Sequence, residues 1–268
     1  MKSNKLVIGL YAERSYKEVS YPHMHLRAQL LYASHGTIQV LCNDQVWIVP
    51  PKCAVWIPAR VEHSMVCLSQ VKLNTALIDA QAAAVMGNSC FLIRVSDLLH
   101  ELLIRLNLLE AESVANQTHA EALLNALEIL IFDEIQTANS LPIQIPWPKD
   151  KRLSRICELM MQSPQHTKDL NTWADEMGTS SRTLMRLFKK QTGLSYRGWI
   201  QQMHIALALS KIADGQSMSS IAEALGYSSP SAFSAMFKRH LGITPQQFKS
   251  YEMMEDQNLI TARNTIDK

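Results

Sequence analysis

One short segment occurs twice in this chain, and that repeat constrains the fold more than any other feature. LMRLFKKQTGLS occupies residues 184–195, and FSAMFKRHLGIT occupies residues 233–244. In each copy Phe-Lys and a second basic residue precede a glycine, and a hydroxyl residue follows the glycine two positions later. An Ala-to-Gly spacing also repeats upstream, at 174–178 and 222–226. Two copies are too few for a solenoid, so the repeat predicts two related helical motifs.

Each copy predicts a helix–turn–helix. A short helix, over about residues 170–177 and again over about 218–225, ends at a glycine. A turn leads into a second helix, over about 181–191 and 230–240. The glycine indicates that the chain leaves the short helix in a left-handed conformation. The residues suited to cap the second helices are Ser180 and Ser229.

The second helix of the first copy has two distinct faces. Leu184, Leu187 and Phe188 share an apolar face at helical spacing, and the opposite face is largely basic. The major groove of DNA admits one α-helix, whose outer residues contact the base edges. Arginine can donate two hydrogen bonds to guanine, and apolar groups can contact the thymine methyl. The residues predicted to contact bases are Arg182, Met185 and Arg186.

The second copy carries smaller side chains at the outer positions, namely Ser231, Ser234 and Ala235. Small residues allow close approach to DNA but offer little direct readout. We therefore expect this helix to contribute backbone and shape contacts more than base specificity. The basic residues at or near the ends of both second helices are suited to phosphate groups: Lys189, Lys190, Lys238 and Arg239.

Charge divides the chain unevenly, although the net charge is only +2. Residues 151–250 hold 13 Lys and Arg against 6 Asp and Glu, a net charge of +7, whereas residues 1–150 hold 11 against 14, a net charge of −3. A basic domain favours a polyanion partner such as DNA. The alternative is an ordinary solvated surface. One long helix over 195–213 would hold the two motifs about 34 Å apart, the spacing of successive major grooves on one side of a duplex.

The N-terminal half predicts β structure followed by two helices. Short runs rich in Val, Ile, Leu and aromatic residues alternate with turn signals, which is typical of a small antiparallel barrel or sandwich. The predicted strands are 28–34, 37–42, 45–50, 53–58, 63–69 and 71–78. Residues 97–109 and 119–136 then show helical leucine stripes. These stripes either pack on the barrel or form a dimer contact.

The predicted fold class is therefore α+β and multidomain. A barrel with its helical pair spans residues 1–138, and a proline-containing linker spans 139–150. A helical domain with two helix–turn–helix motifs spans 151–250, and a tail spans 251–268.

Histidines mark a candidate site in the predicted barrel. His23-x-His25, then Gln29 and the later His63, resembles the cupin pattern, in which a Glu stands at the position of Gln29 and the set binds a divalent metal. Imidazoles suit zinc, iron or nickel, whereas a neutral amide is a weaker ligand. A metal-bound sensor, a metal-free pocket and histidines that only satisfy polar positions stay open. The predicted ligand-binding set, with no metal or other cofactor assigned, is His23, His25, His63, Trp47 and Trp56.

The helical domain resembles the AraC/XylS class of bacterial transcription regulators over about 100 residues. The most specific part is GYSSPSAFSAMFKRHLGITPQQF, residues 226–248, although YSSPSAFS has Ser where many members have Asp or Glu. The resemblance implies binding to promoter DNA, contact with RNA polymerase and a homodimer contact through 97–136. WIVPPKCAVWIPARVEHSM, residues 47–65, is also similar to cupin-bearing regulators linked to efflux or toxicant genes.

Cysteine usage and the N-terminus predict a cytoplasmic protein. The five cysteines are scattered and form no CxxC pair, which is typical of reduced thiols. We find neither a signal peptide nor a predicted membrane span. We therefore expect a transcription regulator that responds to a small-molecule effector, as activator or repressor, and not an enzyme. Two alternatives stay open: an architectural DNA binder without an effector, and a metal-dependent cupin enzyme.

Overall fold

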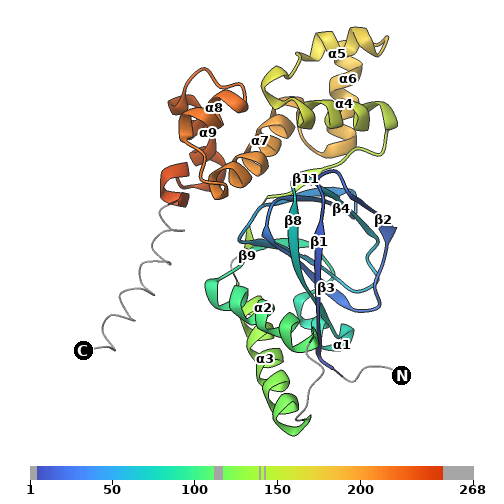
Figure 1. The fold of residues 1–268 in the computed structure, drawn as a ribbon. Coiled ribbons are helices and arrows are strands. Elements are labelled where there is room, and N and C mark those ends of the chain that lie inside the picture. The colour runs from blue at the N-terminus through green and yellow to red at the C-terminus, as the bar shows by residue number, and fades with distance from the viewer. Residues whose placement is uncertain (1–4, 112–116, 139, 142, 250–268) are drawn as a thin grey trace, which may run out of the picture. The chain divides into compact units, whose positions relative to one another are not determined.

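The computed structural model describes residues 5–111, 117–138, 140–141 and 143–249 (Figure 1). The chain divides into two compact units, Met1–Gln144 and Ile145–Lys268. The first unit is a β structure with a helical pair, and the second is helical, so the predicted α+β fold class is confirmed. None of the helices in the described ranges is long and apolar enough to cross a bilayer.

Two antiparallel sheets form the N-terminal unit. One sheet has the strand order β1 (Val7–Arg14), β8 (Val71–Ile78), β3 (Ala28–His35), β6 (Cys53–Ile57), β9 (Phe91–Arg94) and β10 (Ser140–Leu141). In the other sheet the neighbours are β5 (Gln45–Val49), β4 (Ile38–Cys42), β7 (His63–Cys67) and β2 (Val19–His23). β-Branched and aromatic residues fill these strands because they pack well on a half-buried pleated surface.

Helices α2 (Asp97–Ala111) and α3 (Gln117–Thr137) cover one face of the six-stranded sheet (Figure 1). Leu99, Leu103 and Leu106 are buried against sheet residues such as Leu30. The leucine stripes are thus part of the core. Leu98 and Leu130 belong to these stripes by their helical spacing in the sequence, but they are exposed, because the face that meets the sheet is centred on Leu99 and Ile131.

The structure adds elements that the sequence pattern did not predict. β1 and β2 precede the first predicted strand, 28–34, and β9 lies between the helix α1 (Ala80–Ala83), which leads into the 3₁₀ turn η1 (Ala84–Met86), and α2. The segment predicted as a linker contains β10, which pairs with β9, and the short strand β11 (Ile145–Pro146). Pairing with distant strands stabilises these short segments, and this information is absent from local periodicity.

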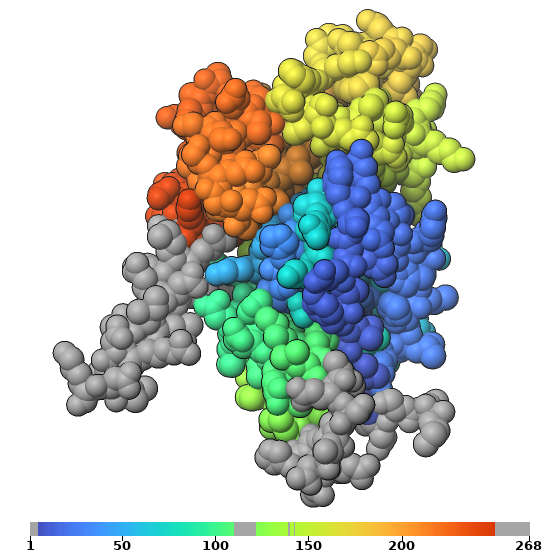
Figure 2. Space-filling view, in the orientation of Figure 1, coloured from blue at the N-terminus to red at the C-terminus, as the bar shows by residue number. Residues whose placement is uncertain are grey.

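The C-terminal unit contains α4 (Lys151–Gln162), the 3₁₀ turn η2 (Pro164–His166), α5 (Leu170–Glu176), α6 (Ser181–Thr192), α7 (Tyr196–Ala213), α8 (Met218–Ala224) and α9 (Pro230–Leu241). The predicted pairs of short and second helices are confirmed as α5–α6 and α8–α9. Helix α7 contacts both pairs. In Figure 2 the helices α4–α6, with the first motif, are yellow-green to yellow, and α7–α9, with the second motif, are orange.

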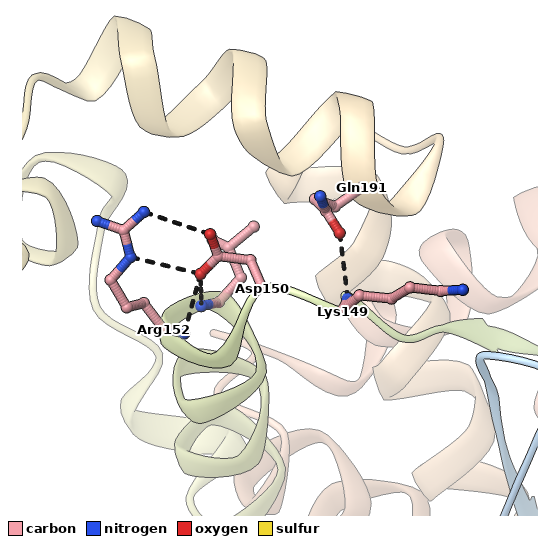
Figure 3. A network of polar contacts seen from close by, with 5 residues as sticks. Lys149, Asp150, Arg152 and Gln191 are labelled. Carbon is pink, nitrogen blue, oxygen red and sulfur yellow. Dashed lines mark hydrogen bonds and ion pairs between the residues drawn. The ribbon is translucent and has the colours of Figure 1, made fainter.

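A polar network holds the beginning of α4 against the end of α6 (Figure 3). The Asp150 carboxylate caps α4 by accepting hydrogen bonds from the backbone N–H groups of Arg152 and Leu153. The backbone N–H of the preceding Lys149 donates to the Gln191 Oε1 in α6 at 3.1 Å. The first motif is therefore tied to the helix that precedes it.

Candidate DNA-binding surface and effector site

The same backbone devices build both helix–turn–helix motifs. Gly178 and Gly226 have φ angles of 63° and 75°, in the left-handed region that glycine enters without strain. The Ser180 and Ser229 hydroxyls each accept a hydrogen bond of 3.2 Å from a backbone N–H three residues later. The predicted turns and N-caps are therefore confirmed. Each second helix begins directly after its capping serine, three residues after Gly178 in the first motif and four residues after Gly226 in the second.

Helix α6 buries one face and exposes the other. Leu184 and Phe188 are buried, and the Phe188 ring makes an edge contact with the Trp199 ring of α7 at 5.9 Å. On the opposite face Arg182 and Arg186 are exposed, and the Met185 side chain between them is 52% exposed. The helix thus presents two guanidinium groups one turn apart, with an apolar thioether beside them.

Helix α9 has the same inner face but a different outer one. Phe233 and Phe237 are buried with ring centroids 5.7 Å apart, and Phe237 also contacts Phe248. Ser231 and Ala235 are exposed as predicted. Ser234 is half-buried, so it lies at the edge of the outer face, next to the buried Phe233 and Phe237.

The four predicted phosphate-binding residues, Lys189, Lys190, Lys238 and Arg239, are all exposed. One of them already has an intramolecular partner. The Lys189 Nζ donates to the Gly193 carbonyl at the C-terminus of α6, where a cation is favourable. A phosphate contact by Lys189 must therefore compete with this helix cap.

Helix α7 holds the two motifs by different polar contacts. Near its start, the Tyr196 hydroxyl accepts a hydrogen bond from the Trp173 indole N–H at 3.0 Å, and Trp173 belongs to the first motif. In its middle, the His204 Nδ1 and the Tyr227 hydroxyl are hydrogen-bonded at 3.1 Å, and Tyr227 belongs to the second motif. Burial lowers the pKa of His204 to about 4, so this contact contains a neutral imidazole at pH 7.

The three predicted histidines of the N-terminal unit converge. One ring nitrogen of each of His23, His25 and His63 lies within 4.8 Å of the others. His23 and His63 face each other on the paired strands β2 and β7, with ring centroids 4.4 Å apart. His25 lies beyond the end of β2, so it reaches the cluster from the following loop rather than from the predicted strand.

Backbone carbonyls orient two of these rings. The His23 Nδ1 is 2.7 Å from the Tyr21 carbonyl, and the His63 Nδ1 is 3.0 Å from the Val61 carbonyl. A carbonyl can only accept, so each Nδ1 carries the proton and each Nε2 keeps its lone pair. Burial lowers the pKa of both His25 and His63, and the neighbouring histidines lower it further. His25 and His63 therefore favour the neutral imidazole, whose unprotonated nitrogen has a free lone pair.

This donor set fits a divalent ion such as zinc or nickel. The ligands would be the three imidazoles, since backbone acceptors behind ligating histidines are typical of metal sites. Gln29 is also buried, and no described residue hydrogen-bonds its Oε1. Its strand neighbour Leu30 faces the helices, so Gln29 faces the opposite, inner side of its sheet.

The structure separates the two predicted tryptophans. Trp47 of β5 lies opposite Val40 of β4, and Cys42, two residues further along β4, lies opposite His63 of β7. Val40 and Cys42 project from the same face of the sheet, and so do the residues opposite them. Trp47 therefore lies on the same sheet face as the histidine cluster. Trp56 does not fit the prediction. It pairs with Leu30 and is buried beneath the helices α2 and α3, because the β3–β6 register turns it to the outer face of its sheet.

A further feature of this unit, a pocket, was not predicted from the sequence. It has a volume of about 280 Å³ and lies between β1, β3, β8 and α2, and its lining includes Ser34, Asn74 and Asn107. The Asn74 amide donates to the Ser34 hydroxyl at 2.7 Å, and the buried Asn107 amide donates to the Asn74 Oδ1 at 3.1 Å. The sequence signal for this site is Asn74, a buried asparagine in the middle of β8.

Comparison with known proteins agrees with this arrangement. The AraC-like ligand binding domain family matches residues 7–166, and the helix-turn-helix domain family matches residues 173–251. The HTH-type transcriptional regulator NimR of Escherichia coli strain K12 is 34% identical over 229 residues, which cover 84% of this chain and 81% of NimR. The HTH-type transcriptional activator RhaR of the same strain is 23% identical and covers 91% of this chain and 92% of RhaR. The structure of ToxT from Vibrio cholerae aligns over 91% of this chain and 98% of ToxT, with 14% identity and a TM-score of 0.37.

The fold, the duplicated motif and the matched domains define a transcription regulator with an effector-binding domain and a DNA-binding domain. The chain belongs to the AraC family, which confirms the resemblance of its motifs to that family.

Proposed function

We propose that α6 is the base-reading helix and that Arg182, Met185 and Arg186 contact base edges in a major groove. One observation carries this proposal: the second helix of a helix–turn–helix buries Leu184 and Phe188 on one face and exposes two arginines around a methionine on the other. Arginine is the side chain that most often recognises guanine, by two hydrogen bonds to O6 and N7.

Helix α9 enters the next groove with its small outer residues, Ser231, Ser234 and Ala235. Their size supports close approach and shape recognition rather than base discrimination. Lys190, Lys238 and Arg239 then neutralise phosphates, and Lys189 does so once its cap opens. Base specificity is therefore concentrated in the first motif.

The effector site lies at the histidine cluster, with Trp47 on the same sheet face. Convergent polar groups in a largely apolar barrel are typical of small-molecule sites. Calorimetry with Zn²⁺ or Ni²⁺ tests the metal-bound form of this site. Binding that is lost in His25→Ala selects a metal-bound sensor. If neither ion binds, the metal-bound sensor is excluded, and a metal-free pocket or histidines that only satisfy polar positions stay open. Turnover of a substrate would favour a cupin enzyme instead.

A homodimer contact through 97–136 uses the apolar residues that the core leaves exposed. Ile129 is 65% exposed, and Leu130, Leu98 and Leu108 are exposed as well. In this assembly the protein binds promoter DNA in the cytoplasm and contacts RNA polymerase, as activator or repressor. Control of an efflux or stress-response gene stays a prediction that the family resemblance alone supports.

Selection of bound sequences from a random DNA pool, with the purified full-length protein, tests the DNA-binding proposal. We expect one enriched motif with two segments spaced by one helical turn, the segment under α6 being the more restricted. Retention of many unrelated sequences with similar affinity would favour an architectural binder. A motif confined to a single groove would contradict the use of both helices.

A further inference from the structure

Two thiols that are distant in the sequence meet in the N-terminal unit. The Cys42 Sγ lies 2.7 Å from the Cys90 Sγ, although the residues are 48 positions apart. Cys42 ends β4 in one sheet, and Cys90 immediately precedes β9 in the other sheet. A disulfide bond measures about 2.05 Å, so a movement of less than about 1 Å would close this pair.

The surroundings of the pair permit both access and movement. Cys42 is only 1% exposed, but Cys90 is half-buried and follows the exposed residues 87–89. Gly87 has a φ of 78°, and a Cβ at this position would meet nothing within 4 Å. Space is therefore open around Gly87, and the partial exposure of Cys90 is the feature that admits a small oxidant.

The pair also lies next to the histidine cluster. Cys42 lies directly opposite His63 in the β4–β7 pairing, and His63 lies directly opposite His23 in the β7–β2 pairing. Residues opposite each other on antiparallel strands project from the same face, so the thiol and both imidazoles form one row across the sheet. A covalent change at Cys42 therefore acts one strand away from the proposed effector site.

We propose that Cys42 and Cys90 form a redox-active dithiol that hydroperoxides convert reversibly into a disulfide. In the first step a thiolate sulfur attacks the terminal peroxide oxygen, the O–O bond breaks, and sulfenic acid and an alcohol (or water) form. The second sulfur then displaces water and forms the S–S bond. The pair loses two electrons and two protons, and the peroxide takes up both. A small-molecule thiol reverses the reaction by thiol–disulfide exchange.

One further point agrees with this assignment. Disulfides in reducing compartments are usually transient and redox-sensing, which matches thiols that are close but still reduced.

The disulfide would tie the end of β4 to the chain before β9, across the two sheets. It would hold one edge of the histidine cluster in a single arrangement. We expect the oxidised protein to bind its effector site ligand with a changed affinity, and only this last expectation rests on the proposed function.

The test uses the full-length protein treated with hydrogen peroxide and then alkylated after unfolding without reductant. We expect the alkylatable cysteines to fall from five to three, peptide mapping to recover a Cys42–Cys90 cross-link, and dithiothreitol to restore all five. Cys90→Ser should abolish the cross-link, and so should Cys42→Ala if Cys42→Ser does not fold. Cys157→Ser, in α4 of the other unit, should retain it.

The proposal would be overturned if peroxide left both thiols alkylatable or oxidised them only to sulfinic acid. A link between either of them and another cysteine would overturn it as well. These mass measurements need neither DNA nor effector, so they stand even if the DNA-binding proposal fails. The coupling to the effector site is tested with whichever of Zn²⁺ and Ni²⁺ the reduced protein binds. If the cross-linked protein binds this ion at the histidine cluster with unchanged affinity, the coupling is overturned.

Discussion

The two helix–turn–helix motifs of this chain are equivalent inside and different outside. Both leave the short helix through a left-handed glycine, cap the second helix with serine and end it at a second left-handed glycine, Gly193 or Gly242. Phe188 and Phe237 occupy the same buried position. The outer positions differ. At the positions where α6 has Arg182, Met185 and Arg186, α9 has Ser231, Ser234 and Ala235.

This contrast shows that the structure and the recognition surface of such a motif vary independently. The inner face must satisfy close packing, where the loss of a few methylene groups costs several kcal/mol. The outer face contributes little to stability, so its residues are determined by the partner. A duplicated motif can therefore retain its fold while one copy specialises in base contacts and the other in backbone contacts.

The largest expected effect tests the equivalence of the two cores. Phe188→Ala and Phe237→Ala should each destabilise their own motif by about 3–5 kcal/mol, since each removes a fully buried aromatic ring. Hydrogen–deuterium exchange of the amides in α6 and α9 measures the two motifs separately. Each variant should accelerate exchange mainly in its own motif. Equal acceleration in both would show that α7 unites them into one cooperative core.

The next effect tests the difference between the outer faces. Arg186→Ala should cost about 1–3 kcal/mol on the cognate site and relax the base preference under α6, because it removes a two-hydrogen-bond contact. Fluorescence anisotropy with cognate and random duplexes measures both affinities. Ser234→Ala, in α9, is the matched control, and we expect a change within about 0.5 kcal/mol. Equal losses on both duplexes for Arg186→Ala would contradict base reading.

A third prediction uses the contacts of α7. The pKa of His204 is about 4 in the folded protein, below the value of about 6.5 for an unfolded chain. The unfolded state therefore binds more protons between these values, and folding stability falls as the pH decreases through this window. We expect the second motif to lose about 2 kcal/mol between pH 7.5 and pH 5.

His204→Gln keeps a polar partner for Tyr227 but does not titrate. Urea unfolding of the full chain, followed at pH 5 and pH 7.5, should show a smaller decrease in stability for this variant than for the natural protein. The Trp173–Tyr196 contact of the first motif contains no histidine. An identical pH dependence in both proteins would refute the role of His204.

Much of this architecture follows from local sequence signals. The six predicted strands and both helix–turn–helix motifs correspond to observed elements because alternation, glycine and capping residues act over a few neighbours. The early strand β1 was not predicted, since its stability depends on pairing with β8, far along the chain. The short strand β10 depends in the same way on β9.

For the site residues, too, local sequence signals predict what depends on nearby residues and miss what depends on pairing with distant strands. Residues on helices were placed on the correct face by periodicity, as for Arg182 and Arg186, with Ser234 as a partial exception. The position of Trp56 required the register between two strands, which local composition does not contain. The meeting of Cys42 with Cys90 required the packing of two sheets, and the spacing of 48 residues gave no indication of it.

The smallest effect separates two lysines at equivalent positions. Among the described residues the Lys238 Nζ has no hydrogen-bond or ion-pair partner, whereas the Lys189 Nζ caps its own helix. Lys238→Ala should weaken binding to all sequences alike and reduce the slope of log affinity against log salt by about 0.9, the value for one phosphate. Lys189→Ala should change this slope less, because its ammonium must first leave the Gly193 carbonyl. Binding measured over a salt series decides between them, and an unchanged slope for Lys238→Ala would remove this residue from the phosphate contacts.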